Sequence, residues 1–274
     1  MRFRAQSLRA LRQELEALDG GLWLSSEEPI YAVNRIQQQY SVITLVCDEP
    51  VATEERLEVA RLEAEGYQTV SVFVDDLFRF EQLPFDLDEL PATFSKFRKV
   101  VEKKPSLLPD RPIDSRPMGV CIAQVWPDPA EWQEALEIPL DPSTEVPTHG
   151  GEESANRHWK SYLDAGALSH YKQTRNAFQG LMQSSHLSAW LAHGCISPRQ
   201  IWWDTLQYEQ DVEANESTYW LRFELLWREY FRWYSRASDW TLFRRTGPRD
   251  QVFGFDQNAR RFERWKTGHT GCDI

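Results

Sequence analysis

The chain has 274 residues, of which 41% are hydrophobic and 27% are charged, so it is long enough for one large core or two ordinary ones. Its formal net charge of −11 excludes proteins that coat nucleic acid with their whole surface. The charge is uneven, because residues 1–149 hold 15 Lys and Arg against 27 Asp and Glu, whereas residues 150–274 hold 16 against 15. A local basic patch in the second half is therefore compatible with the composition.

The cysteines and the hydropathy indicate the compartment. No CxxC pair or Cys/His cluster at metal-binding spacing occurs, so we expect no metal site and reduced thiols. The thiols in question are Cys47, Cys121, Cys195 and Cys272. No apolar run approaches membrane length, and the N-terminus lacks the apolar core of a signal peptide. We expect a cytoplasmic protein with no membrane contact, and an organelle stays open as an alternative.

The first hundred residues alternate between helix and strand signals. Residues 2–18 carry leucines at helical spacing and end at Gly20-Gly21. The elements expected after them are a strand at 22–24, a helix at 32–40, a strand at 42–46, a helix at 53–65 and a strand at 69–74. This alternation is typical of βαβ units and a parallel sheet. A parallel sheet usually opens with a buried strand. None precedes the first helix, so we expect an α/β domain that lacks its opening unit.

The second half carries helical signals alone. Thr93–Lys104 is expected to be a basic amphipathic helix, and the Pro-rich stretch after it reads as a linker. Further helices are expected at 152–164, 187–193, 197–213 and 218–235. Ser197 is an expected N-cap followed by Pro198 at the first helical position. The expected domains are therefore a partial α/β domain at 1–104, a linker at 105–149 and a helical domain at 150–274.

The stretch 218–234, TYWLRFELLWREYFRWY, is the most unusual in the chain. At 3.6 residues per turn its aromatic side chains fall along one face. They are Trp220, Phe223, Trp227, Phe231 and Tyr234. Glu224 falls on that face with Arg228 one turn later, an order that favours an ion pair. One interpretation is a structural ion pair in a Trp-rich core, because an unpaired buried carboxylate is costly. The other is a helix that presents an acid and an indole to a ligand.

Several motifs together resemble those of one family. In chain order they are LPFDLDELPATFSKFRKVVE (83–102), GGE (150–152), YKQTRN (171–176), SSHLSAWLAHGCISPRQ (184–200), YEQDVEANESTYWLRFELLWREYFRWYS (208–235) and WKTGHTG (265–271). Each motif alone is a weak signal. Together, in this order along the chain, they resemble the photolyase/cryptochrome family, and within it the DASH branch.

The resemblance implies a fold and a function. The fold would be an N-terminal partial Rossmann-like α/β antenna domain followed by an incomplete all-α FAD-binding domain. The function would be that of a DNA photolyase, a lyase that uses FAD and blue light to repair cyclobutane pyrimidine dimers, mainly in single-stranded DNA. A full-length member would be a monomer. The pattern stops short at both ends, so we expect this chain to bind FAD weakly or not at all and to repair nothing.

The resemblance also assigns roles to individual residues. Tyr171 would lie near the FAD phosphate and ribose, and Arg175 would contact the DNA backbone. The segment that would wrap the diphosphate comprises Ser184, Ser185, His186, Leu187 and Ser188. Arg228 would contact the flavin, Glu224 would be the active-site acid that also contacts DNA, and Trp227 would stack on the extruded dimer. The alternatives are a water-exposed tyrosine, a surface arginine and an ordinary serine N-cap.

Other assignments leave alternatives open. Glu54 or Glu55 would lie near a folate antenna, methenyltetrahydrofolate, or would be an exposed acid on a charged helix. Trp240 and Trp265 are candidates for an electron relay, although most tryptophans are more simply core residues. Two other functions remain open, a blue-light sensor without repair and a flavin-free nucleic-acid-binding protein.

Overall fold

The structure, a computed structural model, describes residues 2–40, 44–104, 106–112, 149–252, 254 and 258–271. The chain forms two compact units, Met1–Ala237 and Ser238–Ile274. The predicted boundaries at 104 and 149 stay a prediction, because most of the segment between them lies outside the described residues. The described part is mostly helical with one small parallel sheet.

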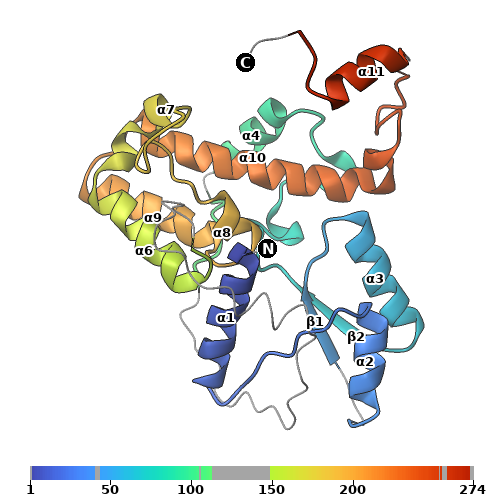
Figure 1. Cartoon of the computed structure of the whole chain (residues 1–274). Coiled ribbons are helices and arrows are strands. Elements are labelled where there is room, and N and C mark those ends of the chain that lie inside the picture. Colours follow the sequence, from blue (N-terminus) through green and yellow to red (C-terminus); the bar gives the residue numbers. More distant parts are fainter. Residues whose placement is uncertain are drawn as a thin grey trace. The chain divides into compact units, whose positions relative to one another are not determined.

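The first unit begins with the alternating elements that the sequence predicts. They are α1 (Arg2–Glu16), α2 (Pro29–Gln37), β1 (Thr44–Asp48), α3 (Thr53–Ala64) and β2 (Gln68–Val72). The two strands are parallel, with Val46 opposite Val70, and α2 and α3 lie beside them (Figure 1). Their small core joins Ile30, Val33, Leu62 and Tyr67.

One predicted strand is wrong. Residues 22–24 form no strand, and the described part of the chain contains only β1 and β2. A strand needs a neighbour for its backbone N–H and C=O groups, and three apolar residues cannot supply one.

The rest of the first unit is helical where the structure describes it. Its α-helices are α4 (Phe94–Glu102), α6 (Glu152–Asp164), α7 (Tyr171–Thr174), α8 (Ser188–Ala192), α9 (Pro198–Asp211) and α10 (Glu216–Ser238). Short 3₁₀ turns lie at Phe80–Gln82, Leu87–Glu89 and Ala167–His170. The described residues after 148 form no strand, which is the pattern that the sequence predicts. Ser197 accepts a hydrogen bond from the Arg199 N–H, and Pro198 occupies the first turn, so the predicted cap of α9 is confirmed.

A glycine pair joins α1 to the start of α6. The Gly150 N–H donates to Gln6 and the Gly151 N–H donates to Ser7. A Cβ at Gly150 would lie 2.2 Å from the carbonyl oxygen of Phe3, and Gly151 has φ +105°. Glycine fits both positions, because Gly150 leaves no room for a Cβ and Gly151 has a positive φ that other residues rarely adopt.

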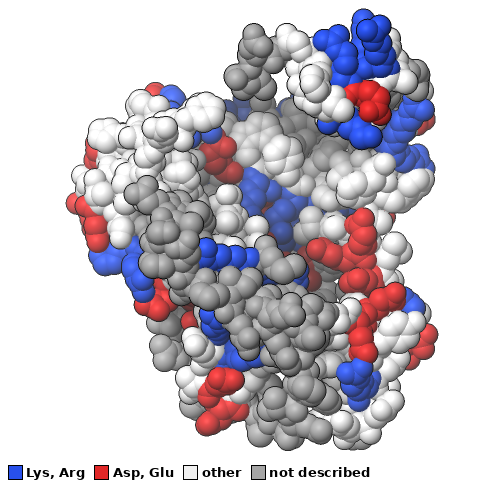
Figure 2. All heavy atoms as spheres, in the orientation of Figure 1, with Lys and Arg blue, Asp and Glu red and all other residues white. Residues whose placement is uncertain are grey.

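The large core gathers side chains from most of these helices. Trp159, Trp190 and Trp233 are fully buried in it, together with Phe78 and Phe97. The long α10 crosses this part of the unit, and α6, α8 and α9 lie to one side of it (Figure 1). On the face shown in Figure 2, acidic side chains gather over α3.

The second unit contains a 3₁₀ helix at Asp239–Phe243 and α11 (Ala259–Lys266). Four of the eight residues of α11 are basic, and basic side chains gather over it in Figure 2. Trp240 and Trp265 are 54% and 67% exposed, and Arg244 lies 3.4 Å above the Trp240 ring. The proposed electron-relay role of these two tryptophans stays a prediction.

Candidate functional site

The faces of α10 differ from the sequence prediction. Glu224 lies at the border of the aromatic face, where it accepts a hydrogen bond from Trp220. It lies with Leu221, Leu225, Arg228 and Arg232 along a stripe that lines a cavity. Trp227, by contrast, stacks on Phe94 of α4 with ring centroids 3.7 Å apart. The helix thus directs an acid and two arginines to one side and its stacked aromatics to another.

The cavity has a volume of about 500 Å³ and combines apolar walls with polar groups. The apolar lining comes from Leu187, Leu191, Ala192, Leu221 and Leu225. The polar lining comes from Asp75, Tyr171, Ser185, Ser188, Glu224, Arg228 and Arg232. Such a mixture, at this size, is typical of a small-molecule site.

The serine-rich segment before α8 supplies one wall. Ser185 and Leu187 are buried, while His186 between them is exposed and has φ +49°. The left-handed conformation at His186 lets its two neighbours face the interior while its own ring stays outside. His158 Nε2 lies 2.8 Å from the Ser185 carbonyl oxygen and holds the segment in place. Ser184, like His186, is not among the lining residues.

Tyr171 supplies a phenol at the start of α7 and is 6% exposed. Burial raises the pKa of its hydroxyl, and the Glu224 carboxylate raises it further. Arg175 and hydrogen bonding with Ser185 oppose this shift of the pKa only in part. The hydroxyl is therefore protonated at neutral pH and is available as a donor.

The ion pair of Glu224 with Arg228, one of the two interpretations of this helix face, does not form. Glu224 Oε1 lies 2.7 Å from Arg175 Nη1 and accepts a 3.0 Å hydrogen bond from Trp220 Nε1. Arg228 turns instead to Asp75, donating to its carbonyl oxygen at 2.7 Å and to its carboxylate. Spacing within a helix permits an ion pair, but a partner from another segment wins where its geometry is better.

Asp75 and Asp76 follow β2 and neutralise a row of arginines on α10. Arg232 donates to both carboxylates, and Arg236 donates to Asp76 from two nitrogens at 2.8 and 2.9 Å. Burial opposes the charge of Asp76, yet hydrogen bonds from Arg236 and Arg232 keep its pKa below the ordinary value. Burial outweighs the arginines at Asp75 and raises its pKa. The cavity wall is thus an arginine-rich surface whose charge is largely compensated.

The sequence interpretation missed Asp75 and Arg232, although both line the cavity. One signal could have found them. Arg228, Arg232 and Arg236 recur at intervals of four residues, so they share one face of the helix. Three cations on one face of a Trp-rich helix need acidic partners, and the adjacent acids 75–76 directly after a predicted strand could supply them.

Trp227 is another predicted site residue that lies outside the cavity lining, as do Ser184 and His186. Besides Phe94, it stacks on Phe231 with centroids 5.3 Å apart, and it is not among the lining residues of the cavity. In the other half of the chain, Glu55 accepts hydrogen bonds from the N–H groups of Val51 and Ala52, so it caps α3. Glu54 is exposed.

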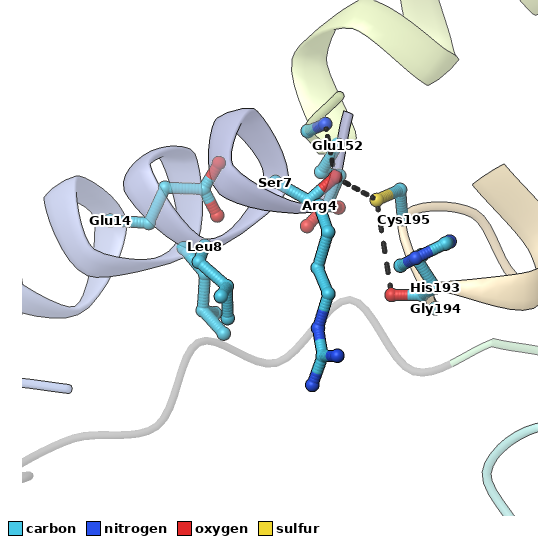
Figure 3. A pocket seen from close by; sticks show the side chains of 10 residues that line it. Arg4, Ser7, Leu8, Glu14, Glu152, His193, Gly194 and Cys195 are labelled. Atoms are coloured by element: carbon cyan, nitrogen blue, oxygen red, sulfur yellow. Dashed lines mark hydrogen bonds between the residues drawn. The ribbon is translucent and has the colours of Figure 1, made fainter. Parts of the chain in front are cut away.

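A second cavity of about 270 Å³ lies between α1 and the end of α8. Figure 3 shows Arg4, Glu14 and Leu8 reaching toward it from α1, with Cys195 opposite. The Cys195 thiol lies 3.4 Å from Ser7 Oγ. Among the residues that the structure describes, no three His, Cys, Asp or Glu side chains gather as they would around a metal ion. No described helix is long and apolar enough to cross a membrane.

Comparison with known proteins shows which family this chain is similar to. The sequence profile of the DNA photolyase family matches residues 1–117. The cryptochrome DASH of Vibrio parahaemolyticus is 39% identical over 271 residues, which make up 98% of this chain and 59% of that protein. The cryptochrome DASH of Synechocystis is 33% identical, over 99% of this chain and 57% of its own length.

Solved structures give the same result. A crystal structure of a Synechocystis cryptochrome superposes with a TM-score of 0.83 at 32% identity, covering 98% of this chain and 57% of that one. A class III photolyase from Agrobacterium tumefaciens shares the fold, with a TM-score of 0.72 at 21% identity over 97% of this chain and 56% of its own. The chain thus spans little more than half the length of these relatives. Over nearly its whole length the chain is similar to cryptochromes DASH, and the DNA photolyase family profile matches its first 117 residues.

Proposed function

We propose that the cavity beside α10 is the FAD site of a DASH-type photolyase, and that the activity is light-driven repair of cyclobutane pyrimidine dimers, preferably in single-stranded DNA. One observation carries the proposal. Six residues that the resemblance assigns to flavin or substrate line a single cavity: Tyr171, Ser185, Leu187, Ser188, Glu224 and Arg228. They come from three segments of the chain, and nothing in their sequence spacing requires them to meet.

The lining fits a flavin dinucleotide chemically. The leucine walls suit the flat apolar faces of its rings, and hydroxyl groups of Ser185 and Ser188 suit its phosphates. Arg228 adds a guanidinium whose orientation is fixed by Asp75. Bound FAD would supply, once excited by light, the electron that opens the dimer.

The chain's own residues would then position the substrate. Glu224 is 30% exposed at the cavity and would accept a hydrogen bond from a pyrimidine base. Arg175, beside it, would hold a backbone phosphate. The Tyr171 hydroxyl, which is protonated at neutral pH, would donate to the cofactor. In the antenna half, Glu54 is the residue that we propose for a folate, because Glu55 is engaged in capping α3.

The experiment that tests the flavin site is a titration of the purified chain with FAD, followed by flavin fluorescence. The variant Ser185→Ala removes one hydroxyl from the cavity, and Ser161→Ala removes a hydroxyl that binds only the Arg157 carbonyl of its own helix. Because the chain is expected to bind FAD weakly at best, the titration extends to high flavin concentration. We expect weak but saturable binding that weakens further in S185A and is unchanged in S161A. Equal binding by all three proteins would contradict the assignment.

A second candidate function is favoured by one observation. Trp227, which the resemblance assigns to stacking on the dimer, is engaged with Phe94 instead of lining the cavity. A flavoprotein that senses blue light without repair needs no such platform. A repair assay on single-stranded DNA with a defined thymine dimer separates the two, because a sensor without repair would leave the dimer intact.

A further inference from the structure

The contacts of Arg175 and Trp220 with Glu224 form an arrangement that the resemblance does not assign. Both residues bind the same carboxylate oxygen, Oε1, with Arg175 Nη1 at 2.7 Å and Trp220 Nε1 at 3.0 Å. The guanidinium also lies 5.6 Å from the centre of the Trp220 ring. The three side chains therefore form one small cluster at the cavity.

Trp220 holds its position independently of Arg175. Its ring stacks on Phe223 with centroids 4.7 Å apart, and Phe223 in turn meets Phe94 of α4 edge-on at 5.1 Å. An indole N–H is a donor that never accepts or titrates. Trp220 can therefore keep the Glu224 carboxylate in place whatever Arg175 does.

Arg175 is a partner that can leave. It follows α7, a helix of four residues, and its side chain is 29% exposed. Ion pairs with this much solvent contact change an equilibrium by about fivefold at most. A backbone phosphate offers the guanidinium two strong acceptor oxygens in a matching geometry, so it can compete with one carboxylate oxygen.

A second cation, Lys172, also lies over the Trp220 ring and pairs with an acid. Lys172 lies 4.7 Å from the centre of the Trp220 ring and pairs at 2.7 Å with Glu216, whose side chain is 80% exposed. The edge of the cavity thus carries two cations over one indole, each held by an exposed or half-exposed acid. Such cations are available for exchange with phosphate while their aromatic support remains.

We propose that Arg175 is a latch that exchanges the Glu224 carboxylate for a phosphate of a bound strand, and that Trp220 is the positioning residue that keeps Glu224 at the cavity when the latch opens. The proposal rests on the proposed function, because it takes DNA as the ligand of this edge. The consequence is that binding of a strand and release of Glu224 are coupled. Glu224 competes for Arg175 in the free protein and is released toward a base only when a strand has bound.

The test uses the whole chain, without flavin, and a fluorescent undamaged oligothymidylate. Binding is measured by anisotropy for the wild type, E224Q, R175Q and the double variant over a range of salt concentrations. We expect E224Q to bind about threefold to fivefold more tightly than the wild type, because Arg175 no longer has a competing acid. R175Q should bind more weakly, with a salt slope smaller by about 0.7.

The double variant separates the latch from a general effect of charge. Removing one negative charge favours DNA binding at any nearby position, and this effect persists when Arg175 is absent. The gain from E224Q should therefore fall to less than about 1.5-fold in the R175Q background. Equal gains in both backgrounds overturn the latch and leave the proposed function standing. Binding by none of the four proteins overturns both.

A spectroscopic measurement tests the role of Trp220. Its indole N–H resonance, assigned by its absence in W220F, should be shifted downfield by the carboxylate. The shift should persist in R175Q and on addition of the oligonucleotide, and it should decrease in E224Q because an amide is a weaker acceptor. Loss of the shift in R175Q or on strand binding would show that Trp220 does not hold Glu224 by itself.

Discussion

The Glu229 carboxylate, buried in the middle of α10, accepts a 2.9 Å hydrogen bond from the backbone N–H of Leu77, which lies 152 residues earlier in the chain. It also accepts from the N–H of Phe78 at 3.1 Å and from the indole of Trp233 at 2.8 Å. Burial, together with nearby Asp76, nevertheless raises the pKa of Glu229 to about 7. The helix that lines the cavity is thus fixed to the segment after β2 by an acid that titrates near neutrality.

The first prediction concerns pH and Glu229. Its pKa is higher in the folded than in the unfolded chain, so the folded protein binds more protons between about pH 4.5 and pH 7. The free energy of unfolding should therefore fall as the pH rises through this window, and the loss should be complete above it. Urea unfolding at a series of pH values measures this slope.

Two variants isolate the contribution of Glu229. In E229Q only the amide oxygen can still accept, so one N–H that bonds the ionised carboxylate loses its acceptor, and the stability should drop by about 1–3 kcal/mol above pH 7. The decline between pH 4.5 and 7 should become smaller. The control E58Q makes the same change at an exposed position of α3. A decline of the same steepness in E229Q and the wild type would assign the pH dependence to other groups.

The second prediction concerns Asp76, which is fully buried between Arg232 and Arg236. Asp76→Asn leaves two guanidinium groups without their shared counter-charge, so we expect a loss of about 3–5 kcal/mol in the free energy of unfolding. The exposed Asp88→Asn serves as the matched control, with an expected change within about 0.5 kcal/mol. Similar urea midpoints for D76N and D88N would rule out a structural role of this network.

The pKa of Asp76 gives the opposite pH dependence from that of Glu229. It is lower in the folded chain than its ordinary value of 3.8, so its stabilising effect is present above that value and is lost as the pH falls further. D76N should therefore lose less stability than the wild type on acidification below pH 4. Acid unfolding curves of the two proteins, measured by circular dichroism, check the sign of this difference.

The third prediction concerns Gly150. An added Cβ would meet the Phe3 carbonyl oxygen at 2.2 Å and Ser7 Oγ at 2.5 Å, and the first of these is a backbone atom that cannot turn away. Gly150→Ala should destabilise the protein by about 1–3 kcal/mol by forcing α1 away from the start of α6. Gly254→Ala, where nothing lies within 4 Å, is the control. Thermal unfolding of both variants provides the measurement, and equal midpoints would contradict the close packing.

The fourth prediction concerns Phe94, which is 5% exposed beneath Trp227. Phe94→Ala removes the ring on which Trp227 stacks and should cost about 3–5 kcal/mol of stability. The freed indole should also become accessible, so quenching of tryptophan fluorescence by acrylamide should increase. The double variant F94A/W227F identifies the responsible indole, because the added quenching should disappear in it. Persistent added quenching would mean that another tryptophan has moved.

Much of the local structure follows from the sequence alone. The leucines of residues 2–18 and the glycines after them predict α1, because apolar spacing of three and four residues suits only a helix with one buried face. Ser197 and Pro198 predict the start of α9 for a similarly local reason, since a side-chain oxygen and a missing N–H both satisfy the first turn. The alternation before residue 75 predicts the parallel pairing of β1 with β2.

The tertiary structure alone decided which partners these residues have. The pattern of α10 permits a Glu224–Arg228 pair, but Arg228 binds Asp75, 153 residues away, and Glu224 binds Arg175. The spacing of residues in the sequence predicts which side chains are neighbours on one helix. It does not predict how far they lie from side chains of another segment. The same reason explains Trp227, whose place on the aromatic face is local while its stacking partner on α4 is not. Residues 22–24 likewise have the composition of a strand without a neighbour that could pair with them.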